Sequence, residues 1–349
     1  GNGNSLVVKK GIGFLKDLQR EDGSWPIDTD LSTWVTTLAV KAMDKEVFSF
    51  FNTSQVEAIR RYLIQSQYKE KHPFNGAAPG GWGWTSFPGS VPDVDDTSGA
   101  ILALLTVYSG SKEEDKAVLA ACKWLVDLQN TDGGMPTFCK GWGRLPFDSS
   151  CPDLSGHVLA AYCSALSVLE NHFPFHFKPK VLKSLQKAIA YLEKKQSPSG
   201  SWEPLWFGNQ QAANKTNRVY GTAKISMYLQ DSLSCKVLPA KSKLQLADML
   251  QKANKYLLEQ QNFDGSWGGE KGLSGTIEET SLAIGSLAGY DLDACYRGLG
   301  FLEKYIIENG FKAHPIGLYF ASLWYDEKLY PVVFYTEALR RVKTAMLQK

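Results

Sequence analysis

Three aspartates, Asp93, Asp95 and Asp96, lie within four residues of one another, and an apolar stretch with helical character follows them directly. Like charges at this spacing repel, and burial disfavours ionised carboxyls further, so a buried cluster keeps at least one proton near neutral pH. A histidine beside such a cluster fixes the direction of the proton, and His157 in the sequence SGHVL is the candidate. The cluster is then an oriented Brønsted acid.

A simpler interpretation exists for each of these residues. Ionised carboxylates are favoured at helix N-termini, so the simpler interpretation of the aspartates is a solvated helix cap. His157 on an apolar helix is by default a hydrogen-bonded core histidine. The strongly apolar sequence after Asp96 favours the acid over the cap, because a solvated cap has no need of that setting.

Aromatic residues recur near the starts of the apolar helical stretches and in the turns before them: Trp34, Trp84, Phe138, Trp206, Tyr220 and Tyr319. Alkenes are very weak bases, so their protonation needs a strong acid and the exclusion of water. The carbocation that forms is stabilised by aromatic faces, which attract cations without bonding to them. The residues therefore predict protonation of a carbon–carbon double bond.

Six repeats position these residues. An aromatic–Leu pair recurs six times, and in the first five copies a Gln follows the aromatic residue by five positions: Gln19, Gln67, Gln129, Gln196 and Gln261. A Gly turn follows, in which the Gln amide can satisfy free carbonyls at the end of a helix. After each turn comes a nearly uncharged helical stretch, expected at 32–40, 95–105, 155–166, 220–229, 278–289 and 315–325.

The helices before the turns are amphipathic, which places them outside the uncharged ones. Six hairpins of this kind predict an all-α fold, a single closed (α/α)6 barrel, in which the starts of the inner helices meet at one mouth. We expect one domain over residues 1–349 and no second barrel domain.

These residues resemble class II terpene cyclases of the squalene–hopene cyclase family. Asp93–Thr97 reads DVDDT and matches the family's DxDD acid motif, and the Q-x3-G-x-W turns are similar to its QW repeats. The resemblance runs from about Gly11 to the C-terminus. It implies that Asp95 is the proton donor, flanked by Asp93 and Asp96, and that His157 hydrogen-bonds the acid.

The resemblance also implies roles for the aromatic residues. Trp84 takes the place of a cation-stabilising Phe, Tyr220 supports the wall, and the remaining residues fall on cavity-lining positions: Trp34, Phe138, Trp206 and Tyr319. Glu278 and Glu279 stand where hopene cyclases carry uncharged residues. They are interpreted as a terminating base, as a contact for a polar head group, or as helix caps.

With no second barrel expected, the chain resembles single-domain members of the family. This resemblance implies a farnesylated hydroxybenzoate as the substrate and a drimane-like meroterpenoid as the product. Two alternatives stay open: an excised catalytic domain of a two-domain squalene–hopene cyclase, and a non-catalytic barrel that binds a lipid or a protein.

No cofactor and no metal are expected, because Asp95-Asp96 is not followed by the DDxxD pattern of magnesium-dependent synthases. A formal net charge of +2 gives no reason to expect nucleic acid. We expect a cytoplasmic monomer with a hydrophobic polyprenyl substrate and at most weak peripheral contact with a membrane.

Overall fold

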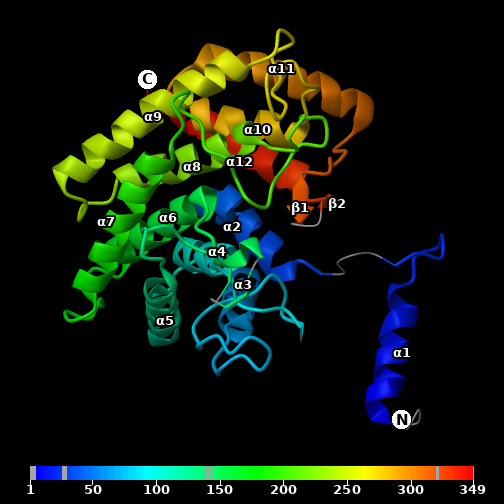
Figure 1. The fold of residues 1–349 in the computed structure, drawn as a ribbon, viewed down its shortest axis with the longest axis vertical. Helices are drawn as coiled ribbons and strands as arrows, with labels where there is room; N and C mark the ends of the chain where they lie inside the picture. The colour runs from blue at the N-terminus through cyan, green and yellow to red at the C-terminus, as the bar shows by residue number, and fades with distance from the viewer. Residues whose placement is uncertain are drawn as a thin grey trace.

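The computed structural model describes residues 5–25, 30–87, 89–138, 141–143, 145–319 and 322–348, with the side chains of 46 and 47 excepted. The described chain is almost entirely helical (Figure 1). Its elements, in order, are α1 (Leu6–Leu18), α2 (Ser32–Phe48), α3 (Thr53–Ser66), α4 (Val94–Thr106), α5 (Lys112–Leu128), the 3₁₀ helix η1 (Pro146–Asp148), α6 (Pro152–Val168), α7 (Lys178–Lys195), α8 (Arg218–Leu233), α9 (Ala240–Gln260), α10 (Ile277–Leu287), α11 (Leu292–Asn309), β1 (Gly317–Tyr319), β2 (Leu323–Tyr325) and α12 (Tyr330–Leu347).

The even-numbered helices form the inner ring. Each packs on the next, and α12 packs on α2, which closes the ring. Every residue of α10 is buried, whereas α7 buries one face and leaves its lysines in solvent. This difference follows from the sequence, since an uncharged helix needs burial all round and an amphipathic one needs it on a single side. The predicted closed barrel of helical hairpins is confirmed.

Glutamine side chains join neighbouring hairpins. Four glutamines each donate from Nε2 to the carbonyl of the glycine in their own turn and to a carbonyl in the following outer helix, at 2.8–3.0 Å: Gln67, Gln129, Gln196 and Gln261. The expectation that these amides satisfy free carbonyls is confirmed. Each of these glutamines therefore joins two neighbouring repeats by hydrogen bonds, and the turns fix the spacing of the outer helices.

The last inner helix differs from the prediction. Residues 315–325 were expected to form it, but they contain the antiparallel hairpin β1–β2, in which Gly317 pairs with Tyr325. The backbone N–H of Leu318 donates to the Trp206 carbonyl at 2.8 Å, so the hairpin extends along the turn before α8. The apolar run here is short and rich in aromatic residues, which suits a strand, and α12 takes the inner position instead.

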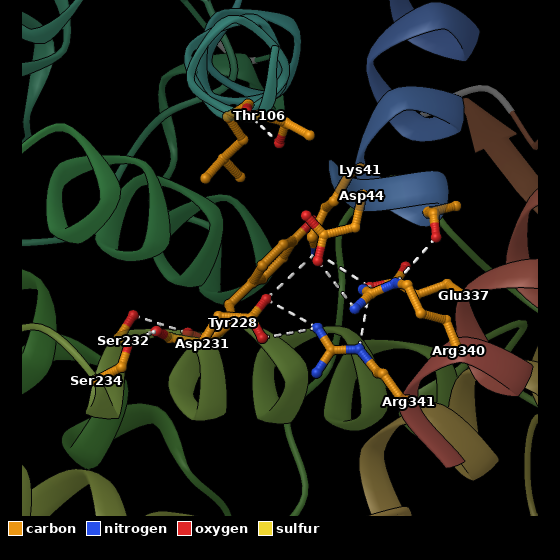
Figure 2. Close-up of polar contacts among 12 residues, drawn as sticks. Lys41, Asp44, Thr106, Tyr228, Asp231, Ser232, Ser234, Glu337, Arg340 and Arg341 are labelled. Carbon is orange, nitrogen blue, oxygen red and sulfur yellow. Dashed lines mark hydrogen bonds and ion pairs between the residues drawn. The ribbon is translucent and has the colours of Figure 1, made fainter. Parts of the chain in front are cut away.

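The sequence prediction missed α12 because this helix is charged. Its Glu337 is buried and accepts from Arg341 Nε at 3.1 Å, and it lies 3.5 Å from Lys41 Nζ of α2. Arg341 also donates to Asp231 of α8 at 2.8 Å. Figure 2 shows these side chains converging from three inner helices. An ion-pair network, rather than apolar packing alone, therefore joins these helices.

No helix in the described part of the chain combines the length and the apolar character needed to cross a bilayer. The cysteines among these residues are buried free thiols, and Cys139 lies outside the described residues.

Candidate active site

A cavity of ≈ 200 Å³ opens at the end of the barrel where α2, α4 and α6 begin. Its wall is aromatic and aliphatic except for the three aspartates and one threonine. The residues that line it are Leu31, Trp34, Trp84, Asp93, Asp95, Asp96, Thr137, Phe138, Phe147, Leu154, Trp206, Phe207, Tyr319 and Tyr325. The structure therefore brings together the aspartate cluster and five of the six aromatic residues named from the sequence.

Asp93 and Asp96 contribute to the structure of the site as well as to its acidity. Asp93 is the N-cap of α4, where its Oδ1 accepts the backbone N–H of Asp96 at 2.8 Å. Burial raises the pKa of Asp93 to about 7. Burial, together with the neighbouring Asp93 charge, raises the pKa of Asp96 well above its ordinary value. Since Asp96 Oδ1 is buried without a hydrogen-bond partner, this pair keeps a proton at neutral pH.

Asp95 differs from its two neighbours because it is not fully buried. Its side chain is 24% exposed, and its Oδ1 lies 2.5 Å from His157 Nδ1. His157 starts the second turn of α6, so the two residues meet because α4 and α6 are adjacent inner helices. The predicted proximity of His157 to the aspartate cluster is confirmed. His157 itself does not line the cavity, and it supports Asp95 from behind.

The environment of His157 favours its neutral form. Burial lowers the pKa of His157, although the hydrogen bond to Asp95 opposes the shift. Its ring stacks on Tyr228 with centroids 4.5 Å apart, and Lys41 Nζ lies 4.3 Å from the centroid of the same tyrosine. A second cation, Lys224, lies 5.3 Å from that ring. Both cations disfavour a charged imidazole, and a neutral ring that carries its proton on Nδ1 can donate to Asp95.

The aromatic rings form a continuous wall. Phe147 stacks on Trp206 at 5.3 Å, and Phe138 meets Phe147 edge-on at 5.1 Å. The indole N–H of Trp206 donates to Thr137 Oγ1 at 2.8 Å, and that of Trp34 donates to a tyrosine hydroxyl at 2.7 Å. Because the polar edges are bonded to protein, the ring faces are what the cavity presents.

Tyr220 is the one aromatic prediction that does not reach the cavity. It is buried behind Phe207 and stacks on that ring at 4.1 Å. This position agrees with the supporting role that the resemblance implied. Phe207 itself lines the wall and was not singled out from the sequence, nor were Phe147 and Tyr325.

A fourth carboxyl near the cluster, Asp153, was not among the predicted site residues. It is buried at the start of α6, beside Cys151, and burial together with the charge of Asp95 raises its pKa to about 6. The position of Asp153 in its helix is a sequence signal that could have indicated it. Asp95 and Asp153 each stand two residues before a hydroxyl, Thr97 or Ser155, that accepts a backbone N–H from the preceding turn. Comparing inner helices at this position would have found Asp153.

Glu278 and Glu279 do not line the cavity. Both are fully buried at the start of α10. Glu279 accepts from the Nδ2 atoms of Asn209 and Asn217 at 2.9 and 3.0 Å, and burial raises its pKa to about 7. Glu278 accepts the backbone N–H of His314 at 2.8 Å. These contacts hold the loops that precede α8 and the β1–β2 hairpin.

Comparison with known proteins assigns the chain to a family. The model of the squalene–hopene cyclase C-terminal domain matches residues 31–283, which include the aspartate cluster, His157 and the wall from Trp34 to Phe207. The chain belongs to the squalene–hopene cyclase family. Its match to enfumafungin synthase from Hormonema carpetanum is 26% identical over 355 residues and covers 92% of this chain and 25% of that protein.

Solved structures agree on the fold of this squalene–hopene cyclase family member. The ent-copalyl diphosphate synthase from Streptomyces platensis superposes with a TM-score of 0.65 at 18% identity, covering 95% of this chain and 55% of that one. The type II terpene cyclase MstE from Scytonema, in complex with geranylgeranyl dihydroxybenzoate, gives 0.63 at 15% identity, covering 97% and 96%. The chain spans well under half the length of curated relatives that it matches. It covers, for example, 39% of the probable squalene–hopene cyclase of Sinorhizobium fredii.

Proposed function

We propose that this chain is a class II terpene cyclase, in which Asp95 protonates an alkene of a linear polyprenyl substrate. One observation supports this most strongly: Asp95 reaches an aromatic cavity while its Oδ1 is bonded to His157 at 2.5 Å. The proposal applies to the described barrel and uses no metal or cofactor.

The acid works as a unit. Neutral His157 donates to Oδ1 of Asp95, which leaves Oδ2 as the protonated oxygen. Asp93 and Asp96 behind it keep a further proton, since burial raises the pKa of both carboxyls. Asp95 becomes a carboxylate when it gives up its proton. A protonated Asp93 or Asp96 repels this carboxylate less than an ionised one would, so the ionised form of Asp95 has a lower free energy. The hydrogen bond from His157 also strengthens as charge develops on Asp95.

The reaction then runs along the substrate. The π electrons of the terminal alkene take the proton from Asp95, the O–H bond breaks, and a tertiary cation forms. The next alkene attacks this cation, and each ring closure moves the positive charge one unit along the chain. The faces of Trp84, Phe138 and Trp206 stabilise the cation, each by up to about 2 kcal/mol in a desolvated site. Transfer of a proton from a carbon next to the final cation to water ends the sequence with a new double bond, and the Asp95 carboxylate takes a proton back from solvent.

A farnesylated hydroxybenzoate is the proposed substrate. The cavity volume of ≈ 200 Å³ lies below the range of about 300–1,000 Å³ typical of drug-sized ligand sites. This favours a short prenyl chain over the thirty-carbon chain of squalene. Among the described residues of the wall there is no Lys or Arg. We therefore place an ionised head group at the mouth, with only the prenyl chain inside.

A product assay tests the proposal and separates it from its alternatives. The purified chain is incubated with farnesylated hydroxybenzoate, geranylgeranyl dihydroxybenzoate or squalene, and products are identified by mass spectrometry. A cyclised meroterpenoid that Asp95→Asn fails to make supports the proposal. Cyclised squalene alone indicates the excised domain of a larger cyclase. Retention of a prenyl ligand without any product indicates a binding barrel.

A further inference from the structure

A single charged residue interrupts the inner part of α8. The stretch from Tyr220 to Leu229 reads YGTAKISMYL and contains no charge other than that of Lys224. This lysine is 3% exposed, so its amine is enclosed by the ring of inner helices. Burial of a charged amine is costly, and a lysine at such a position therefore needs a physical explanation.

Lys224 lies on the face of α8 that backs the candidate active site. Residues four apart share a helix face, which places Lys224 between Tyr220 and Tyr228. Tyr220 stacks on Phe207 of the cavity wall at 4.1 Å, and Tyr228 stacks on His157 at 4.5 Å. The Lys224 Nζ atom is 5.3 Å from the centroid of Tyr228. The amine is thus one aromatic ring away from the imidazole that supports the acid.

The neighbouring ion-pair network is balanced without Lys224. Its members, which converge in Figure 2, pair at 2.8–4.0 Å and comprise equal numbers of cations and carboxylates: Lys41, Arg340 and Arg341 with Asp44, Asp231 and Glu337. Among the described residues, no carboxylate forms an ion pair with Lys224. Its Nζ atom instead lies over two aromatic rings, 5.3 Å from the centroid of Tyr228 and 5.5 Å from that of Phe334. The network and Lys224 together therefore carry one excess positive charge.

The amine of Lys224 is charged and interacts with the acid. Burial is the main cause that lowers the pKa of Lys224 to about 8, and the charge of Lys41 is a smaller one. The carboxylates of Glu337, Asp95 and Asp153 oppose this shift, so they lie close enough to attract the cation. Because its pKa lies above 7, most of the amine is protonated at neutral pH.

We propose that Lys224 is the counter-charge for the carboxylate that Asp95 becomes when it protonates the substrate, an inference that rests on the proposed function. An alkene is a far weaker base than a carboxylate, so the free energy of the ionised Asp95 limits the proton transfer. A positive charge about 10 Å away, at an effective dielectric constant of about 20, favours the ionised form roughly 10- to 20-fold. Lys224 acts on Asp95 through its charge and does not touch the substrate, since it does not line the cavity.

Two substrates of different basicity test this role: the farnesylated hydroxybenzoate and its terminal epoxide. With the epoxide, Asp95 gives its proton to the ring oxygen, the bond from that oxygen to the tertiary carbon breaks, and the oxygen stays on the product as a hydroxyl. An epoxide oxygen is much more basic than an alkene, so its protonation depends less on the strength of the acid. Lys224→Met keeps the length of the side chain and removes the charge. We expect its kcat to fall roughly 10-fold with the alkene and less than about threefold with the epoxide, at unchanged KM.

Further variants separate the charge of Lys224 from its packing. Lys224→Arg keeps the charge and should restore the ratio of alkene to epoxide turnover, whereas Lys224→Gln removes the charge and should repeat the effect of methionine. Lys252→Met changes an exposed lysine of α9 and is the control, which should leave both rates unchanged. The melting temperature of Lys224→Met should equal or exceed that of the wild type, because an apolar side chain replaces a buried charge that lies outside the ion pairs.

The outcomes distinguish this inference from the proposed function. Equal loss of the two activities in Lys224→Met and Lys224→Gln, with Asp95→Asn inactive on the alkene, would overturn the role of Lys224 and leave the proposed function standing. Wild-type kcat on the alkene in both neutral variants would overturn that role as well. Undiminished turnover of the alkene by Asp95→Asn would instead contradict the proposed function, and this inference with it.

Discussion

His157 Nδ1 lies 2.5 Å from Asp95 Oδ1, although the two residues are 62 positions apart in the chain. The contact joins the start of α4 to the second turn of α6, and burial keeps the imidazole neutral and able to donate. One oxygen of Asp95 is thereby occupied, and the other is left for the substrate.

Removal of the His157 donor should lower kcat without unfolding the protein. In His157→Phe the ring still stacks on Tyr228, but the hydrogen bond to Asp95 is lost, and we expect a decrease of roughly 100-fold or more. His157→Asn keeps an N–H donor and should recover part of the rate. Steady-state kinetics with circular dichroism checks both. Equal loss in the two variants would mean that the imidazole acts other than as a donor.

Activity should fall as the pH rises above neutral. The cluster needs its proton, and burial raises the pKa of Asp93 to about 7 and raises that of Asp96 well above its ordinary value. Asp93 is thus mostly protonated below its pKa of about 7 and loses its proton progressively as the pH rises above that value. In Asp93→Asn the helix cap survives, since Asn caps as well as Asp, but the group that titrates near 7 is gone. We expect the alkaline limb of kcat to move to higher pH. An unchanged limb would show that another group controls it.

Loss of a wall aromatic should slow cyclisation and change its products. Phe138 lies between Trp84 and Trp206, with ring centroids 6.4 and 6.5 Å away. Phe138→Leu keeps most of the volume and removes the quadrupole that attracts a cation, so we predict a 10- to 30-fold lower kcat and more prematurely terminated products. Product analysis by gas chromatography measures this. Wild-type rate and product ratios in the variant would argue that the ring only fills space.

The ion-pair network at Glu337 should be essential for stability. Burial alone would raise the pKa of Glu337, but Lys41 and Arg341 outweigh it and hold the pKa below its ordinary value. Glu337→Gln removes one of the two carboxylates that compensate these cations and leaves only Asp231, so we expect a loss of about 3–5 kcal/mol in the free energy of unfolding. Asp127→Asn, which breaks the exposed pair with Lys123, is the control and should cost at most about 1 kcal/mol. Equal effects in urea titrations would contradict the buried network.

The sequence predicts those parts of the molecule that repeat. Uncharged helices after Gln–Gly turns give the inner ring, and the ring brings Asp95, His157 and the aromatic residues to one mouth. The prediction fails where a repeat departs from its pattern. The charges of α12 conceal an inner helix, because ion pairs across the ring replace apolar burial there. The β1–β2 hairpin was taken for a helix because its apolar run is too short for periodicity to decide.

Individual wall residues are harder to predict than the ring. Phe147 reaches the cavity from the 3₁₀ helix and Phe207 from a turn, and neither position repeats along the chain. Glu278 and Glu279 show the converse, since they occupy a repeating position yet bond to nearby loops instead of facing the cavity. The repeat predicts the direction in which each inner helix runs, but contacts with the neighbouring loops determine which side chains face the cavity.

Deuterium transfer tests the role of Asp95 most directly. The chain is exchanged into D₂O, mixed with a farnesylated hydroxybenzoate and quenched, and the product is analysed by mass spectrometry and NMR. Our account predicts one deuteron, located on the former alkene CH carbon next to the dimethyl carbon, and no product from Asp95→Asn although this variant still binds the substrate. A cyclised product without deuterium at that carbon, or undiminished turnover by Asp95→Asn, would contradict it.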